Sequence, residues 1–224
     1  MTNMELTLKE VKANPKIQDF IEKTEQLLDA IGYTDHGKRH VNLVSDRARS
    51  LAQKLGLKKQ DQELVSIAGY CHDMGNFLGR TQHHYWGAFL FSQVFMSLME
   101  DSSGITTVMQ AIASHDKDDL KLVNKISAIL ILADKSDVHR DRVRTKDLKT
   151  IKSDIHDRVN YSVVKNDFSF KGKEIILRLK VDTRITDPLE YFEIFTDRMA
   201  FCRQAAKYLG CKFKLIINDF KLSA

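Results

Sequence analysis

The chain has 224 residues, of which 43% are apolar and 29% charged, with only two prolines. This composition is typical of a globular protein, and the length allows one large domain or a domain with a small appendage. The 35 basic against 30 acidic residues leave a net charge of +5, which suits an anionic ligand. Because no basic run is interleaved with aromatic residues, we do not expect a nucleic-acid partner.

The cysteine content and the apolar runs indicate the compartment. Cys71, Cys202 and Cys211 are widely spaced and odd in number, so they form no disulfide framework and fit a reducing environment. No N-terminal stretch has the charged and apolar regions of a signal peptide, and no apolar run approaches the roughly 18 residues of a membrane span. We therefore expect a cytoplasmic protein without a membrane contact.

The N-terminal two thirds of the chain have the pattern of successive amphipathic helices. In residues 16–31 apolar side chains recur every three or four positions until Gly32, and residues 40–55 repeat this pattern. The aromatic pair Tyr85 and Trp86 is expected to fill the core, as large aromatic side chains mostly do. Further helices are predicted at residues 60–75, 84–99, 105–115 and 121–137.

After Lys146 the pattern changes to that of strands. The residues at 171–173, Lys-Gly-Lys, form a turn signal between two extended runs, and the second run alternates apolar and charged residues. Asp187 before Pro188 then predicts the start of a helix that ends near Leu209.

A third strand is predicted at residues 212–219. We thus predict a mainly α protein. An all-helical bundle would occupy residues 1–146, and a small α+β unit with the order ββαβ would occupy residues 147–224 and pack on the bundle.

Histidines and aspartates that end apolar runs are the candidates for chemistry. The run "SIAGYC" leads into His72 and Asp73, and the run "ILILA" leads into Asp134. Burying an unpaired charge is so costly that such groups are paired, neutralised or bound to a metal. Sets of imidazoles and carboxylates suit iron, manganese, zinc or nickel better than calcium or magnesium. The sequence therefore predicts a site for a divalent transition metal.

Further histidines lie at the ends of other predicted helices. His36 and His40 are four residues apart, so they would share one face if both lie in a helix. His83 and His84 precede an apolar helix, and His115 follows one. Taken alone, any of these histidines could be an ordinary side chain with a hydrogen-bond partner, so the argument for a site depends on the whole set.

The set resembles the metal ligands of the HD-domain superfamily of metal-dependent phosphohydrolases. His40, the pair His72-Asp73 and Asp134 in "LAD" match its four ligands in order and setting, over roughly residues 30–145. The segment "HVNLVSDRARSLA" is similar to the family's first helix, and "AGYCHDMGN" is similar to its namesake motif. The chain looks closest to the YqeK-type branch, whose members have two metals and hydrolyse symmetrical dinucleoside tetraphosphates.

The resemblance implies a centre of two ions of the iron, manganese, zinc or nickel class. Asp73 would bridge the ions and be the central catalytic carboxylate, and His84 is the alternative to His83 as a ligand. The other implied ligands are His40, His72 and Asp134 for one ion and His83 and His115 for the second.

The resemblance also implies a small phosphorylated substrate, of nucleotide type, which is cleaved by a metal-activated water; dinucleoside polyphosphates are one candidate. Arg140 is the first choice for binding its phosphate and Arg80 the second, with His84 as a contact at the rim and His36 orienting a ligand from outside. The alternative is an HD scaffold that binds a phosphorylated ligand without turnover, with residues 147–224 as a regulatory unit. A homodimer is an open option.

Overall fold

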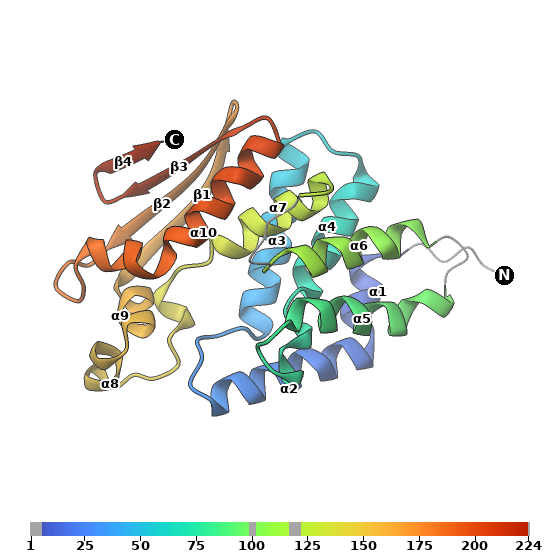
Figure 1. Ribbon diagram of the computed structural model, residues 1–224, viewed down its shortest axis with the longest axis horizontal. Helices are drawn as coiled ribbons and strands as arrows, with labels where there is room; N and C mark the ends of the chain where they lie inside the picture. Colours follow the sequence, from blue (N-terminus) through green and yellow to red (C-terminus); the bar gives the residue numbers. More distant parts are fainter. Residues whose placement is uncertain (1–5, 99–101, 117–121, 224) are drawn as a thin grey trace.

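The structure is a computed structural model that describes residues 6–98, 102–116 and 122–223. Figure 1 shows a helical body beside a four-stranded sheet that carries one long helix. The body contains α1 (Leu8–Ala13), α2 (Pro15–Ala30), α3 (Lys38–Lys54), α4 (Lys59–Cys71), α5 (His83–Phe95), α6 (Ser103–Ser114) and α7 (Lys125–Lys135). Short 3-10 turns follow several of these helices: η1 (Met74–Leu78), η2 (Met96–Leu98) and η3 (Arg140–Arg142).

The C-terminal part begins with two short helices and continues into the sheet. Its elements are α8 (Leu148–Ser153), α9 (Ile155–Ser162), β1 (Val163–Lys171), β2 (Glu174–Val181), α10 (Pro188–Tyr208), β3 (Lys212–Ile217) and β4 (Phe220–Ser223). The strand order is β1-β2-β3-β4. The outer pairs are antiparallel, whereas β2 and β3 are parallel and joined through α10, since parallel neighbours need a crossover.

Local sequence explains where the long helices begin. The Asn14 side chain accepts hydrogen bonds from the first amides of α2, and Pro15 occupies the first helical position. The Asp187 side chain caps α10 in the same way, with Pro188 at the first position. An N-cap acceptor followed by proline is a favoured helix start, because the first amides lack helical partners and proline has no amide hydrogen.

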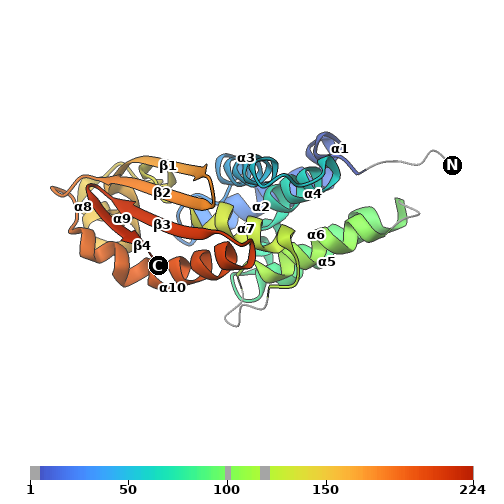
Figure 2. The same ribbon diagram turned by 90° about the horizontal axis from the view of Figure 1, so that it is seen from above.

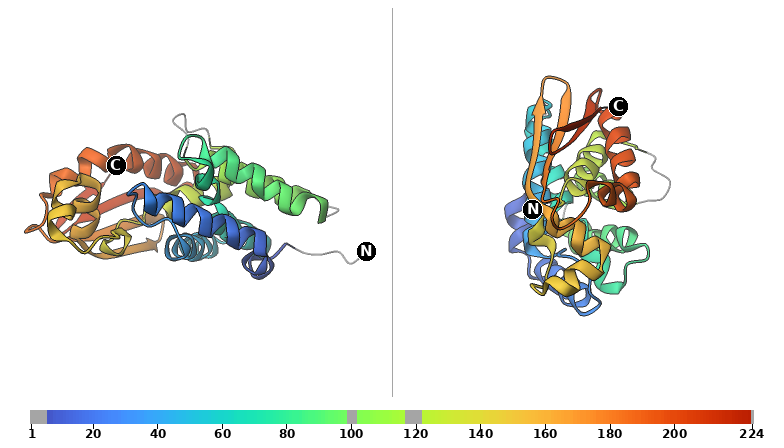
Figure 3. Two further views of the ribbon diagram at one scale, coloured as in Figure 1. Left: turned by 90° about the horizontal axis from the view of Figure 1, so that it is seen from below. Right: turned by 90° about the vertical axis from the view of Figure 1, so that its left-hand side faces the viewer.

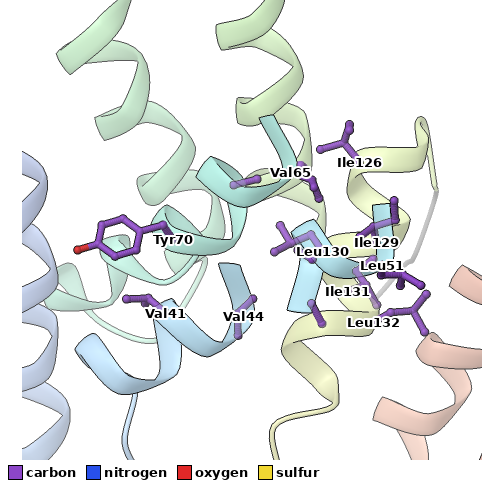
Figure 4. Packing of buried hydrophobic residues seen from close by; sticks show 14 of the residues in the cluster. Val41, Val44, Leu51, Val65, Tyr70, Ile126, Ile129, Leu130, Ile131 and Leu132 are labelled. Atoms are coloured by element: carbon purple, nitrogen blue, oxygen red, sulfur yellow. The ribbon is translucent and has the colours of Figure 1, made fainter. Parts of the chain in front are cut away.

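The centre of the helical body is α7, which packs against α3, α4 and α6. Figure 4 shows side chains from α3, α4 and α7 in one apolar cluster, which includes Val41, Val65 and Leu130. A helix that is apolar on all sides is stable only when it is surrounded. Because α7 is buried along its length, the carboxylate of Asp134 near its end is placed inside the molecule.

The long helix α10 joins the two parts. It packs on β3 and on α7, and Figure 3 shows it along one side of the strands. The sheet face under α10 is apolar, and Ile175, Leu177 and Leu179 on it are fully buried. No helix in the described ranges is long and apolar enough to cross a membrane.

The predicted fold class is confirmed: the chain is mainly α, with a helical bundle and a small α+β unit. The unit has one strand more than the predicted ββαβ order, because β4 is too short to show a period in the sequence. The helices α8 and α9 were also not predicted, since their six and eight residues are mostly polar. The predicted division at residue 146 stays a prediction.

Several predicted boundaries shift. The helix predicted at 60–75 ends at Cys71, and η1 follows separately; the helix predicted at 84–99 ends at Phe95. Residue 99 and residue 121, the predicted end and start of two helices, lie outside the described residues.

The expectation that Tyr85 and Trp86 fill the core is wrong. Their exposed fractions are 46% and 44%, because α5 packs on its neighbours through its opposite face, where Gly87, Ala88 and Phe91 lie.

Candidate metal centre

The structure brings four of the predicted ligands together from three helices. His40 lies in the first turns of α3, His72 and Asp73 follow the end of α4, and Asp134 lies near the end of α7. All four side chains are buried. His40 Nε2 lies 3.2 Å from His72 Nε2, and both nitrogens lie 3.5–3.6 Å from Asp134 Oδ1. Asp73 Oδ2 completes this first ligand set at 3.5 Å from His40 and 3.2 Å from His72.

A second ligand set lies on the other side of Asp73. His83 Nε2 and His115 Nε2 are 3.2 Å apart. They lie 3.2 Å and 3.7 Å from Asp73 Oδ1, the carboxylate oxygen that the first set does not use. The two oxygens of one carboxylate therefore point into different clusters, as a bridging ligand requires.

The spacing of these atoms fits metal coordination. Two ligands with bonds of about 2.1 Å to one ion lie about 3.0 Å apart at an octahedral angle and about 3.4 Å apart at a tetrahedral angle. The ligand atoms are 3.2–3.6 Å apart in the first set and 3.2–3.7 Å apart in the second. Both sets could thus surround a divalent ion without rearrangement.

The histidine tautomers provide a further test of the fit. Nδ1 of His72, of His83 and of His115 lies 2.7–3.0 Å from the backbone carbonyl three residues earlier. A carbonyl only accepts, so Nδ1 carries the hydrogen and Nε2 presents a lone pair to the cluster. Lone pairs that face each other at 3.2 Å repel unless a proton or a cation lies between them. The donor set is therefore one that a metal satisfies.

His40 is oriented by a carboxylate instead of a carbonyl. Its Nδ1 lies 2.7 Å from Asp137 Oδ2, and the Asp137 side chain is fully buried. Arg39 donates to the same carboxylate at 2.8 Å. A carboxylate behind a metal-binding histidine fixes the ring and raises its basicity.

The buried groups stabilise one another in their charged forms. Burial lowers the pKa of His72, but Asp73 and Asp134 outweigh it and raise this pKa to about 10. Burial and Arg142 also lower the pKa of His40, yet hydrogen bonds to the surrounding carboxylates raise it to about 9. Burial raises the pKa of Asp73, but the neighbouring imidazoles, His72 first, outweigh this effect and hold the pKa well below its usual range. The raised pKa of His40 and of His72 favours a proton on the lone pair of each Nε2, and a bound metal ion would replace these two protons.

Close backbone contacts bring the ligands together. A Cβ at Gly69 of α4 would lie 2.9 Å from Ser45 Cα of α3, so only glycine lets these helices approach closely enough for His72 to reach His40. Gly75 of η1 meets the backbone of His83 and Gly87 in the same way. A Cβ at Gly87 of α5 would in turn lie 3.3 Å from the carbonyl oxygen of His72.

Five buried or half-buried residues of the site were not predicted. Asn76 donates to Asp73 Oδ1 at 2.9 Å and accepts from Arg80. Lys135 lies 2.9 Å from Asp134 Oδ2 and 2.7 Å from Asp116 Oδ1. A sequence signal exists for Asp137, because it follows Asp134 by three residues, a spacing that would put both on one face if the helix continued. The five residues are Asn76, Asp116, Lys135, Asp137 and Arg142.

The remaining predicted residues lie at different distances from the ligands. His84 is next to the second set, with its ring centroid 6.2 Å from that of His115; the Nε2 of His83 is the nitrogen that faces Asp73. His36 Nε2 lies 3.1 Å from an Arg142 nitrogen, and burial followed by the Arg142 charge lowers its pKa well below the usual value.

The two predicted phosphate-binding arginines also differ in position. Arg80 lies beside the site, 3.6 Å from Asp116 Oδ2. The guanidinium of Arg140 instead lies over the ring of Tyr161 and donates to its carbonyl at 3.2 Å. The structure thus places Arg80 nearer to the ligand sets than Arg140.

Comparison with known proteins identifies the class. A family model described as "HD domain" matches residues 38–152, and the chain belongs to this family. HD domains bind divalent metals, and membership supports a metal-dependent phosphohydrolase in general. Every predicted ligand lies within the matched residues.

Two individual proteins are similar to the chain. An uncharacterized protein of Methanocaldococcus jannaschii is 27% identical over 157 residues, and the match covers 60% of this chain and 60% of the relative. The crystal structure of a predicted HD superfamily hydrolase from an uncultured Thermotogales bacterium has 21% sequence identity and a TM-score of 0.44. The structural match covers 60% of this chain and 75% of the Thermotogales protein.

Proposed function

We propose that the chain hydrolyses a phosphoester or phosphoanhydride of a nucleotide-type substrate at a centre of two divalent transition-metal ions. The observation that carries this proposal is the division of the Asp73 carboxylate, whose Oδ2 belongs to the first ligand set and whose Oδ1 belongs to the second. A carboxylate that only forms a structural ion pair does not need its two oxygens to face two separate clusters of histidines. Dinucleoside polyphosphates are the first substrates to test.

The side chains around the centre prepare it for an anionic substrate. Asn76 holds Asp73 in its bridging orientation through the hydrogen bond to Oδ1. Lys135 keeps a buried positive charge beside Asp134, and Arg80 adds a second one at the half-exposed side of the site. Cations close to a reacting phosphoryl group stabilise the charge that develops on its oxygens.

The chemistry does not require a nucleophile from the protein. Two bound divalent ions would supply an activated water and polarise the phosphoryl oxygens. The chain's own contribution is to fix the ligands, which it does with Nδ1 hydrogen bonds to backbone carbonyls and to Asp137. In this proposal Arg80 and Lys135 bind the phosphate, whereas Arg140 contacts more distant parts of the substrate or none.

Metal analysis combined with a substrate panel tests the proposal. The purified protein is expected to contain up to two equivalents of transition metal and to hydrolyse at least one nucleotide in a metal-dependent manner. The panel includes mononucleotides, cyclic nucleotides and dinucleoside polyphosphates. Asp73→Asn should abolish turnover, and Asp19→Asn, at an exposed position of α2, serves as the matched control.

Two outcomes would contradict the proposal. Full activity of the metal-loaded Asp73→Asn variant would exclude the bridging role. Metal-dependent binding of a phosphorylated ligand without hydrolysis of any panel member would favour the alternative, an HD scaffold that binds its ligand without turnover.

A further inference from the structure

One face of the C-terminal sheet is covered by α10, and the other is open. Figure 2 shows the long helix along one side of the strands and no helix of the described chain along the opposite side. Strand pairing fixes which side chains share this open face, since directly paired residues point the same way. We call it the outer sheet face; it comprises Lys165, Asp167, Ser169, Lys171, Glu174, Ile176, Arg178, Lys180, Lys212, Lys214, Ile216 and Lys221.

The outer sheet face is strongly basic. It carries seven lysines and arginines but only two acidic residues. Each acidic residue pairs with one of the basic residues: Asp167 Oδ2 lies 3.3 Å from Arg178, and Glu174 Oε1 lies 2.6 Å from Lys214. The other five have no ion pair with a described residue, and all five are exposed: Lys165, Lys171, Lys180, Lys212 and Lys221.

The C-terminal region that contains this face accounts for most of the charge imbalance of the protein. Residues 163–224 contain twelve basic and eight acidic residues, a net +4 of the +5 of the whole chain. Like charges on one surface repel one another. The five lysines without an ion pair are therefore unfavourable together unless an anion binds to them.

The outer sheet face is also concave at one end. A hollow of about 750 Å³ lies between β2, the start of β1 and the turn after β3. Lys165, Arg178 and Lys180 line it, together with the polar Thr183 and Asn218 and the carboxylates of Asp167 and Asp219. A convex anionic body would enter this hollow, whereas a flat membrane surface would span its rim.

We propose that the outer sheet face binds the phosphodiester backbone of a double-stranded nucleic acid without reading its sequence. Side chains that stack on single-stranded bases are aromatic, and no described residue of this face is aromatic. A protein partner would need apolar anchors in a packed pocket, but the only aliphatic residues, Ile176 and Ile216, are half-buried between charged neighbours. Lysines that contact phosphates without base readout are typical of sequence-independent binding. This proposal does not depend on the metal centre.

Salt-dependent binding tests the proposal on the full chain. The probe is a fluorescently labelled 20-base-pair duplex, and its affinity is measured by anisotropy at several salt concentrations. Lys165→Gln, Lys180→Gln and Lys221→Gln are combined in one variant. Each lost phosphate contact reduces the slope of log K against log salt by about 0.9, so the slope should fall by about 2 to 3 and the affinity by at least about tenfold.

A matched control removes the same charge elsewhere. Lys9, Lys58 and Lys59 are exposed on the helical body, and their replacement by Gln should leave both the slope and the affinity unchanged. Equal losses in the two variants, or none in the first, would overturn the proposal. Tighter binding of phosphatidylserine vesicles or of polyglutamate than of the duplex, through the same three lysines, would also overturn it. Metal-dependent hydrolysis of a nucleotide, measured in parallel, should be the same in all three proteins.

Discussion

The two ligand sets of the metal centre differ in what lies behind their histidines. In the first set, His40 is backed by the buried carboxylate of Asp137, which Arg39 holds in place. In the second set, His83 and His115 are backed only by backbone carbonyls. A carboxylate increases the basicity of the ring more than a neutral carbonyl does. We therefore expect the first set to hold its ion more tightly and the second to lose its ion first.

The first ligand set is also less accessible to solvent than the second. The first set lies in the packed core between α3, α4 and α7, where the His40 and His72 side chains have no exposed surface. The second set lies beside Asp116, whose side chain is 32% exposed. A tightly held ion next to a more accessible one would let substrate enter at the second set without disturbing the first.

The largest effect is expected from Asp73→Ala, which removes a ligand from both sets at once. Turnover should fall by more than the roughly 100-fold that loss of an outer hydrogen-bond partner costs, and the content of both ions should fall. Steady-state kinetics and metal analysis check this, with circular dichroism to show that the helices remain. Loss of only one ion would indicate that Asp73 does not bridge.

Single histidine variants separate the two sets. His115→Ala should remove about one equivalent of metal and leave the first ion in place, whereas His40→Ala should weaken the tighter ion. Metal analysis after graded chelation measures both effects. The comparison fails if the wild-type protein loses its two ions in one step, or if His115→Ala empties both sets.

Asp137→Asn tests the carboxylate behind His40. The variant keeps the shape of the side chain but removes its charge, so metal affinity of the first set should fall by roughly 10- to 100-fold while the second set is unchanged. Competition with a chelator gives the affinity. Asp141→Asn is the matched control, because that side chain is 64% exposed and pairs with His139.

The smallest effect is expected at the arginines. Arg80→Ala should raise KM by about tenfold, the magnitude of one lost charge-assisted hydrogen bond, with the metal content unchanged. Arg140→Ala should leave KM close to that of the wild type, because Arg140 contacts Tyr161. A larger KM effect at Arg140 than at Arg80 would restore the role first predicted from the sequence.

The longer helices could be predicted from the sequence because apolar side chains recur at helical spacing, whereas the full ligand set was predicted only through the resemblance to the HD-domain superfamily. His72, Asp73 and Asp134 each end an apolar run, and such a position is unfavourable without a strong partner. The same local rule does not find Lys135, whose ammonium group lies between Asp134 and Asp116, a residue that is distant in the sequence. Its partner is fixed by packing between α6 and α7.

The outer sheet face shows a second limit of sequence reasoning. Its cations come from four strands and are separated by apolar residues of the opposite face, so no basic run exists in the sequence. Register, which depends on strand pairing, places Lys165 opposite Lys180. The expectation of no nucleic-acid partner was based on runs alone, and it could not take this pairing into account.

Three histidines donate to backbone carbonyls three residues earlier in the chain, and this has an evolutionary consequence. Ring orientation at His72, His83 and His115 is set by the main chain, so substitutions at neighbouring positions cannot remove these acceptors. The acceptor of His40 is a side chain and can be exchanged by one mutation. Single substitutions at position 137 can therefore change the affinity of the first set for its ion. The ring orientations in the second set depend on the backbone and are not changed in this way.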